Sequence, residues 1–290
     1  MKYLFFALRP KQWIKNLFIF LPLIFSKKMF IFPDNLKTLV AFLIFSIAAG
    51  VAYLINDIID LERDRVHPIK RLRPVASGKV SVKSACIEVC VLGFFSIVLS
   101  FMLDVYFGWV VVTYIVFNFF YTKFLKDMVI VDVFCLGVFF LLRILAGSVV
   151  IKVALSYWII FMVVLLALFL GFNKRRQELR LLEQKTTIYR KVLDKYNVYF
   201  IDQMISVITS SIVVVYMLYT IDARTVKEFG TKHLMLSIPF VYYGIFRYLY
   251  LIHKLRKEGD PTRILMFDKK MQISIALWIM VCIGVIYFGV

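Results

Sequence analysis

Four polar residues near position 60 have the types and spacing of a divalent-metal site. Asn56, Asp57, Asp60 and Asp64 directly follow a long apolar block. If one helix continues through them, Asn56, Asp60 and Asp64 share a face, and Asp57 lies beside it. Like charges at that spacing repel, so the cluster needs a cation. Mg²⁺ prefers oxygen ligands and often takes one or two carboxylates plus substrate phosphates, so we expect Mg²⁺ here.

A basic loop follows the carboxylates. Residues 65–79 read RVHPIKRLRPVASGK, in which two prolines and a glycine predict a shaped turn rather than a helix. Arg63, Arg71 and Arg73 are cations in the place where a phosphate clamp beside a metal requires them. His67 is the one residue there that titrates near neutral pH, which is a weak indication of acid–base chemistry.

Membrane-spanning helices must position these residues. Of the 290 residues 62% are apolar and 19% charged, against ~45–50% and ~25% in an average soluble domain. An apolar helix of about 20 residues crosses a ~30 Å hydrocarbon core. Such blocks occur near residues 12–30, 36–55, 84–103, 105–122, 129–150, 153–172, 200–221, 234–252 and 271–290. We therefore expect an all-α polytopic membrane protein, a single nine-helix transmembrane domain over residues 1–290. The first block is the weakest, because Lys15 and Asn16 interrupt it.

The distribution of Lys and Arg predicts the orientation. With nine crossings and a cytoplasmic N-terminus, 28 of the 36 Lys and Arg residues fall in cytoplasmic segments, which the positive-inside rule favours. The C-terminus is then external, and loops 57–83 and 174–195 form a cytoplasmic cap over the active site. The alternative for the acidic motif is a solvated helix end balanced by Arg63 and Arg65. Carboxylates at a membrane boundary are costly, however, and tend to be functional.

Several segments carry a resemblance to a known family. The run NDIIDLERDRVHPIKRLRPVASGKV, from Asn56 onward, resembles the first acidic motif and following loop of the UbiA superfamily of intramembrane prenyltransferases. That resemblance implies nine transmembrane helices, a central cavity open to lipid, and a Mg²⁺-bridged diphosphate at the cytoplasmic end.

Three further segments indicate one branch of this superfamily. LRPKQWIKN (residues 8–16), YTKFLKDMVIVDVFCLGVFFLLRILAG (121–147) and GFNKRRQEL (171–179) resemble decaprenyl-phosphate phosphoribosyltransferases. These enzymes transfer 5-phosphoribose from phosphoribosyl diphosphate (PRPP) to a polyprenyl phosphate. Aromatic prenyltransferases carry a second acidic motif after the sixth span. Here Lys174 and Arg175 stand at that place with one carboxylate, Glu178, which we include among the metal ligands. The cations favour a phosphosugar donor.

Other polar residues complete the predicted substrate site. A helix would place Lys11 and Lys15 on one stripe and Gln12 and Asn16 on an adjacent stripe, although an ordinary basic anchor is the alternative. Asp132 and Arg143 lie about three turns apart within the fifth span and should face inward, to bind substrate or as structural ion-pair partners. Tyr121, Lys123 and Lys126 stand at the cytoplasmic entrance of that span, to bind phosphate or to anchor the loop.

These observations favour a Mg²⁺-dependent transferase in the cytoplasmic membrane of a bacterium, which moves 5-phosphoribose from PRPP to a decaprenyl-like phosphate. The second hypothesis is prenyl transfer from a polyprenyl diphosphate to an aromatic or other small acceptor. A lipid or ion transporter is a third, but the chain lacks the repeated halves common in transporters. The net charge of +18 does not indicate nucleic-acid binding, because the basic stretches are short loops. Assembly into a homo-oligomer is left open.

Overall fold

The computed structural model describes residues 2–67, 69–184, 195–253 and 268–289, and these contain helices and no strand. The chain divides into two compact units. The N-terminal unit comprises Met1–Leu155 and Leu182–Lys195, and the C-terminal unit comprises Ser156–Leu181 and Tyr196–Val290. Residues 185–194 of the predicted cap loop 174–195, and residues 254–267, lie outside the described residues.

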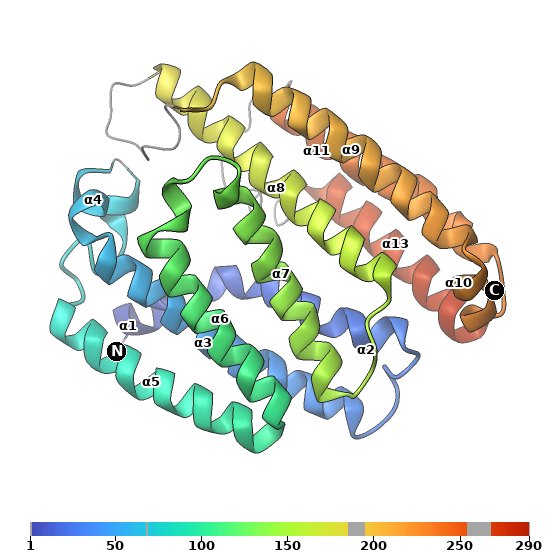
Figure 1. The fold of residues 1–290 in the computed structure, drawn as a ribbon, viewed down its shortest axis with the longest axis horizontal. Helices are drawn as coiled ribbons and strands as arrows, with labels where there is room; N and C mark the ends of the chain where they lie inside the picture. The colour runs from blue at the N-terminus through green and yellow to red at the C-terminus, as the bar shows by residue number, and fades with distance from the viewer. Residues whose placement is uncertain (1, 68, 185–194, 254–267, 290) are drawn as a thin grey trace. The chain divides into compact units, whose positions relative to one another are not determined.

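The N-terminal unit contains the helices around the acidic motif (Figure 1). In chain order they are α1 (Lys2–Ala7), the 3-10 helix η1 (Pro10–Phe20), α2 (Leu21–Phe25), α3 (Asp34–Ile59), α4 (Leu61–Val66), η2 (Lys70–Leu72), α5 (Val82–Leu103), α6 (Val105–Lys123), η3 (Leu125–Asp127) and α7 (Val131–Val150). Helix α3 packs on α5 and α6, and η1 packs on α7 and α3.

The C-terminal unit is also helical. Its elements are α8 (Tyr157–Gln184), α9 (Val198–Ile221), α10 (Ala223–Phe229), η5 (His233–Ser237), α11 (Ile238–His253) and α13 (Lys269–Phe288). Polar residues begin several of these helices: Asn197 caps α9, Asp222 caps α10 and Asp268 caps α13 through their side-chain oxygens. Such caps satisfy backbone N–H groups that have no partner inside the helix.

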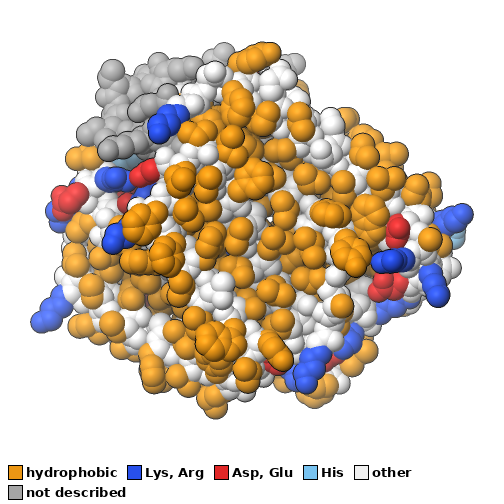
Figure 2. Space-filling model, in the orientation of Figure 1, with side chains coloured by type: hydrophobic (Ala, Val, Ile, Leu, Met, Phe, Trp, Pro, Cys, Tyr) orange, Lys and Arg blue, Asp and Glu red, His pale blue; other side chains and the backbone are white. Residues whose placement is uncertain are grey.

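Eight helices in the described residues are long and apolar enough to cross a membrane. They are Asp34–Ile59, Val82–Leu103, Val105–Lys123, Val131–Val150, Tyr157–Arg180, Val198–Ile221, His233–Ile252 and Lys269–Phe288. They coincide with the second to ninth blocks of the sequence. Figure 2 shows apolar side chains over most of the visible surface. On α5 and α6, for example, Phe94, Met102 and Trp109 are exposed, as lipid-facing residues are.

The first predicted span, residues 12–30, is the exception. This segment forms η1 and α2 and is not one of the eight spanning helices, so the described residues do not confirm the count of nine. Pro10 begins η1 and Pro22 lies at the start of α2. Proline lacks the N–H that an uninterrupted α-helix requires, so a straight helix through this segment is disfavoured.

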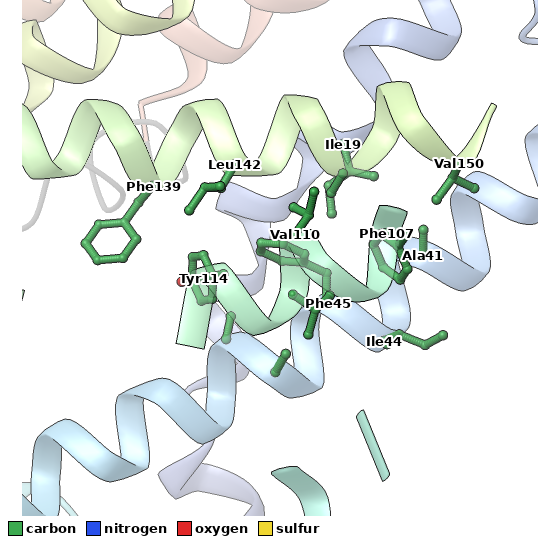
Figure 3. Packing of buried hydrophobic residues seen from close by; sticks show 14 of the residues in the cluster. Ile19, Ala41, Ile44, Phe45, Phe107, Val110, Tyr114, Phe139, Leu142 and Val150 are labelled. Carbon is green, nitrogen blue, oxygen red and sulfur yellow. The ribbon is translucent and has the colours of Figure 1, made fainter. Parts of the chain in front are cut away.

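The core of the N-terminal unit lies among η1, α3, α6 and α7 (Figure 3). Phe45 of α3 packs against Tyr114 of α6, with ring centroids 4.7 Å apart, and Tyr114 packs against Phe139 of α7 at 5.4 Å. Ile19 of η1 is fully buried in the same cluster. Within a membrane the surrounding lipid is as apolar as these side chains, so close packing rather than water exclusion holds the helices together.

Candidate active site

The acidic motif lies where α3 gives way to α4. Helix α3 ends at Ile59 and Asp60 occupies the turn, yet the backbone N–H of Asp60 donates to Asn56 O (2.9 Å) and that of Asp64 donates to Asp60 O (2.8 Å). Helical spacing therefore continues through the break. Asp57 and Asp64, two turns apart, are both 2% exposed, whereas Asn56 and Asp60 are half-buried. The buried pair is thus Asp57 with Asp64, rather than the face predicted from Asn56, Asp60 and Asp64.

Arg73 joins the two buried carboxylates. Its Nη1 donates to Asp57 Oδ1 at 3.1 Å and also to Asp64 Oδ2. Arg73 directly follows η2, so the short 3-10 turn brings the basic loop back over the end of α3. Burial lowers the pKa of Arg73 from its usual value, and the positive charge of Arg9 lowers it further, while Asp57 and Asp64 oppose both effects. The guanidinium is therefore held between two carboxylates and close to a second cation.

Arg9 is that second cation, which the sequence pattern did not predict. Its Nη2 donates to Asp57 Oδ1, and its guanidinium lies 5.1 Å from the centre of the Tyr53 ring. Arg9 has a left-handed backbone (φ 53°), which is strained for a residue with a Cβ and is often found at functional sites. The preceding Leu8 lies close to Gly50 of α3, where a Cβ would meet Leu8 Cβ at 3.0 Å. Gly50 therefore permits the approach that brings Arg9 to Asp57.

The connection between α6 and α7 supplies a third cation. Lys126 in η3 is 3% exposed, and its Nζ lies 2.5 Å from Asp60 Oδ1. Next to Lys126 in η3, Asp127 forms an ion pair with Arg63 at 3.5 Å, and both of these side chains are more exposed than those of Lys126 and Asp60. Each carboxylate of the motif therefore has a basic partner. Asp57, Asp60 and Asp64 on one side and Arg9, Arg73 and Lys126 on the other form what we call the acidic–basic cluster, with formal charges that balance.

The cluster fits a divalent cation that also binds substrate. Among the described residues, no group of three or more His, Cys, Asp or Glu side chains is arranged so that it could hold a metal ion. A metal here would therefore need ligands from water or substrate as well. Asp57 and Asp64, however, flank a single cationic position, which Arg73 Nη1 holds. Asp57 Oδ2 is buried and accepts no hydrogen bond from the described part of the chain. Two carboxylates completed by water and substrate phosphates are a usual Mg²⁺ environment, so these residues fit Mg²⁺.

The predicted stripes on the N-terminal segment change because η1 is a 3-10 helix. Three residues complete a turn there, so residues four apart do not align. Lys11 is exposed, Lys15 is half-buried and Asn16 is 1% exposed. Neither lysine has a side-chain hydrogen bond or ion pair within the described residues, whereas Asn16 donates to Ser46 Oγ at 2.9 Å. The lysines are therefore available to a ligand, and Asn16 is occupied by the fold.

Arg143 is a buried cation inside α7 with uncharged partners. It donates to Asn16 Oδ1 at 2.8 Å, to the Phe139 carbonyl at 2.6 Å and to the Tyr114 hydroxyl at 3.0 Å. Asp132 is fully buried on the same helix. The described contacts of Arg143 are thus with uncharged groups, and a role for Asp132 and Arg143 in substrate binding stays a prediction. Asn16 and Arg143 link η1 to α7.

The remaining predicted residues occupy varied settings. Tyr121 packs in the core against Phe139, with ring centroids 5.5 Å apart. Lys123 is exposed beside Phe119 and Phe124, and Arg71 is exposed in the basic loop.

Lys174, Arg175 and Glu178 belong to α8 in the C-terminal unit. Arg175 is 1% exposed and pairs with Glu178 one turn later, while Lys174 is half-buried. The neighbouring Arg176, also 1% exposed, makes a two-pronged ion pair with Asp202 of α9. This pair was not predicted from the sequence pattern, because its two members lie 26 positions apart.

Within the described residues, eight helices of membrane-spanning length and a buried acidic–basic cluster at the end of one of them indicate an enzyme embedded in a membrane. The chain belongs to the UbiA prenyltransferase family, which it matches over residues 20–267. It is therefore an integral membrane protein and a transferase.

Two relatives and one solved structure are similar to the chain along nearly its whole length. It is 32% identical to a decaprenyl-phosphate phosphoribosyltransferase of Mycolicibacterium smegmatis, covering 98% of this chain and 92% of the relative. The protein of that name from Mycobacterium tuberculosis is 30% identical, with 98% and 94% covered. A UbiA homolog from Archaeoglobus fulgidus bound to GPP and Mg²⁺ superposes with a TM-score of 0.71 at 17% identity, covering 99% of both chains.

Proposed function

We propose that this protein transfers 5-phosphoribose from PRPP to a polyprenyl phosphate at the cytoplasmic membrane face and releases diphosphate. The observation that carries the choice of donor is the near full-length similarity to proteins named decaprenyl-phosphate phosphoribosyltransferase. The acidic–basic cluster supports the reaction type, since three carboxylates and three cations suit a metal–diphosphate leaving group.

The reaction needs no dedicated base. An oxygen of the acceptor phosphate attacks C1 of the ribose, the C1–O bond to diphosphate breaks, and diphosphate leaves with the bonding electron pair. A phosphate monoester has a second pKa near ~6, so the acceptor is already a dianion at neutral pH. This agrees with the residues present, because the acidic–basic cluster contains carboxylates, arginines and a lysine but no histidine.

The protein residues act by binding and orientation. Mg²⁺, when bound, neutralises charge on the leaving diphosphate. Asp57 and Asp64 hold the cation, and Arg73 donates to diphosphate oxygens once these two carboxylates have another partner. Lys126, which pairs with Asp60, supplies a second donor to the diphosphate. Lys11 and Lys15, which have no side-chain partner in the described residues, are assigned to the ribose 5-phosphate or the acceptor phosphate. Lys174 and Arg175 keep their predicted phosphate-binding role on sequence grounds.

The test uses purified protein in lipid nanodiscs with PRPP labelled in the ribose. With Mg²⁺ and decaprenyl phosphate, label should enter an organic-soluble, acid-labile product; without the lipid, or in EDTA, it should stay in the aqueous phase. Label that stays aqueous under all conditions contradicts the proposal.

The second candidate is prenyl transfer from a polyprenyl diphosphate to a small acceptor. It is favoured by the family match and by the fold shared with the Archaeoglobus homolog bound to GPP. Replacing labelled PRPP by a labelled prenyl diphosphate in the same nanodiscs separates the two. Transfer of the prenyl label to a small aromatic acceptor, with no transfer from PRPP, would establish this second function.

A further inference from the structure

The balanced charges of the acidic–basic cluster bear on how a metal reaches the site. A resident Mg²⁺ is usually attracted by an excess of carboxylates. Here Arg9, Arg73 and Lys126 already neutralise Asp57, Asp60 and Asp64, as their ion pairs show. A free divalent cation would meet three positive groups at short range, and Coulomb repulsion between such groups is strong in a partly buried site. The cluster by itself therefore offers little attraction to a bare metal ion.

Arg73 occupies the position between the two buried carboxylates. Its Nη1 contacts both Asp57 Oδ1 and Asp64 Oδ2, so a cation binding to both oxygens must displace it. A displaced arginine needs a new anionic partner, because breaking a buried pair leaves an uncompensated charge. A diphosphate that arrives with the metal provides that partner, and guanidinium groups bind phosphate oxygens in a forked geometry.

Arg9 differs from Arg73 in what holds it. Its guanidinium lies over Tyr53 as well as against Asp57, and its strained backbone is fixed by the packing of Leu8 on Gly50. The two side chains are equally exposed, at 24% for Arg9 and 25% for Arg73, but Arg73 directly follows a three-residue 3-10 turn and, within the described residues, its guanidinium lies over no aromatic ring. Arg9 is therefore held at Asp57 Oδ1 by contacts beyond its ion pair, whereas the described contacts of the Arg73 guanidinium are those with the two carboxylates.

We propose that Arg73 holds the divalent-cation position of the acidic motif and releases it only to a metal that arrives with a diphosphate, so that the metal enters as a co-substrate. The inference rests on the proposed function in one respect, that a diphosphate is the leaving group. It assigns Arg73 a switching role between Asp57, Asp64 and the substrate, and it makes metal and diphosphate binding mutually dependent.

Equilibrium dialysis with radiolabelled Mn²⁺ tests this coupling directly and without turnover. Protein in nanodiscs stays on one side, Mn²⁺ and its pyrophosphate complex equilibrate freely, and protein-free nanodiscs correct for lipid binding. The wild-type protein should retain Mn²⁺ weakly alone and about 10-fold or more tightly with pyrophosphate, a size typical of coupled sites. Equal retention with and without pyrophosphate overturns the proposal, whether or not any variant can be purified.

Variants then assign the coupling to Arg73. Arg73→Gln should bind Mn²⁺ alone about 10-fold more tightly than wild type and lose most of the pyrophosphate dependence, since the competing cation is gone. Arg73→Lys keeps the charge and should bind Mn²⁺ alone as weakly as wild type. Arg65→Gln, which removes an exposed arginine paired with Glu62, is the matched control and should leave both affinities unchanged. A folded Arg73→Gln protein, judged by gel filtration, whose affinity for Mn²⁺ alone is not increased contradicts the assignment.

The two proposals can fail independently. Pyrophosphate is the product of any transferase that uses a diphosphate donor, so the dialysis result does not depend on PRPP. Coupled Mn²⁺ and pyrophosphate binding without phosphoribosyl transfer would refute the proposed donor and leave this inference standing. Phosphoribosyl transfer by a protein that binds the metal tightly without pyrophosphate would refute this inference and leave the proposed donor standing.

Discussion

At the residue scale, burial separates carboxylates that lie close together in the sequence. Asp57 and Asp64 are almost completely buried against arginine, while Glu62 lies between them in sequence with its side chain 81% exposed. Exposed ion pairs such as Glu62–Arg65 contribute little to stability. A buried carboxylate keeps its charge only with a cation beside it, and a bound metal ion can be that cation.

The first prediction compares Asp64→Asn with Glu62→Gln. Asp64→Asn should lower phosphoribosyl transfer at least ~100-fold, because an amide is a poor ligand for Mg²⁺ and no longer balances Arg73. Glu62→Gln should keep activity within about twofold, since its side chain is exposed to solvent. Initial rates with labelled PRPP in nanodiscs provide the measurement. Similar losses in both variants would show that burial at this motif does not select the functional carboxylate.

The second prediction concerns the hydroxyl that Tyr114 presents to Arg143. Tyr114→Phe should lower the free energy of unfolding by about 1.5–3 kcal/mol, the value of a hydrogen bond to a charged group. Tyr106→Phe near the start of the same helix, where the side chain is 72% exposed, is the control and should change little. Unfolding in mixed detergent micelles compares the two. Equal stability of both variants would mean that the Arg143 network is not structural.

Sequence alone identified most of the cluster but not all of it. The carboxylates and Arg73 are close together in the chain, so their spacing was informative. Arg9 lies 48 positions from Asp57, and its role depends on a strained backbone and on the approach permitted by Gly50. Neither has a clear sequence signal. The N-terminal residues were also assigned to the wrong stripes, because the pattern does not reveal that η1 is a 3-10 helix.

At the element scale, the long spans were predictable for a physical reason. A helix in lipid satisfies its own backbone, so twenty apolar residues are enough to define it, and Asp34–Ile59 and Val131–Val150 follow the predicted blocks closely. The segment from Pro10 to Phe25 is different. Its backbone lies directly against α7, where Gly147 leaves room for the carbonyl of Ile19. Such a backbone contact joins two segments that are far apart in the sequence, so the residues of the first segment alone do not predict it.

The third prediction follows from that contact. Gly147→Ala should lower the free energy of unfolding by about 1–3 kcal/mol, since the added Cβ would overlap the Ile19 carbonyl oxygen and neither backbone can yield easily. Gly284→Ala in α13 has open space at the same atom and should be neutral or stabilising by about 0.5–1 kcal/mol. Unfolding in mixed micelles distinguishes them. A Gly147→Ala protein as stable as wild type would argue against the tight packing of η1 on α7.

At the scale of the whole molecule, the orientation in the membrane connects the site to its substrates. PRPP is a soluble, highly charged molecule, so the proposed reaction requires the acidic–basic cluster to face the cytoplasm. The predicted orientation rests on the excess of Lys and Arg in the loops on that side, including Lys79. The turn between α7 and α8, where Ala154 is exposed, then lies on the external face.

The fourth prediction tests this orientation with single cysteines. In a background with the exposed Cys86 and Cys90 replaced by alanine, Ala154→Cys should react with a membrane-impermeant maleimide in intact spheroplasts. Lys79→Cys, also exposed, should react only after lysis, because its loop is predicted to be cytoplasmic. Gel-shift of the labelled protein gives the readout, and full labelling of both after lysis verifies access. The inverse pattern would put the acidic–basic cluster outside the cell and exclude a cytoplasmic PRPP as its donor.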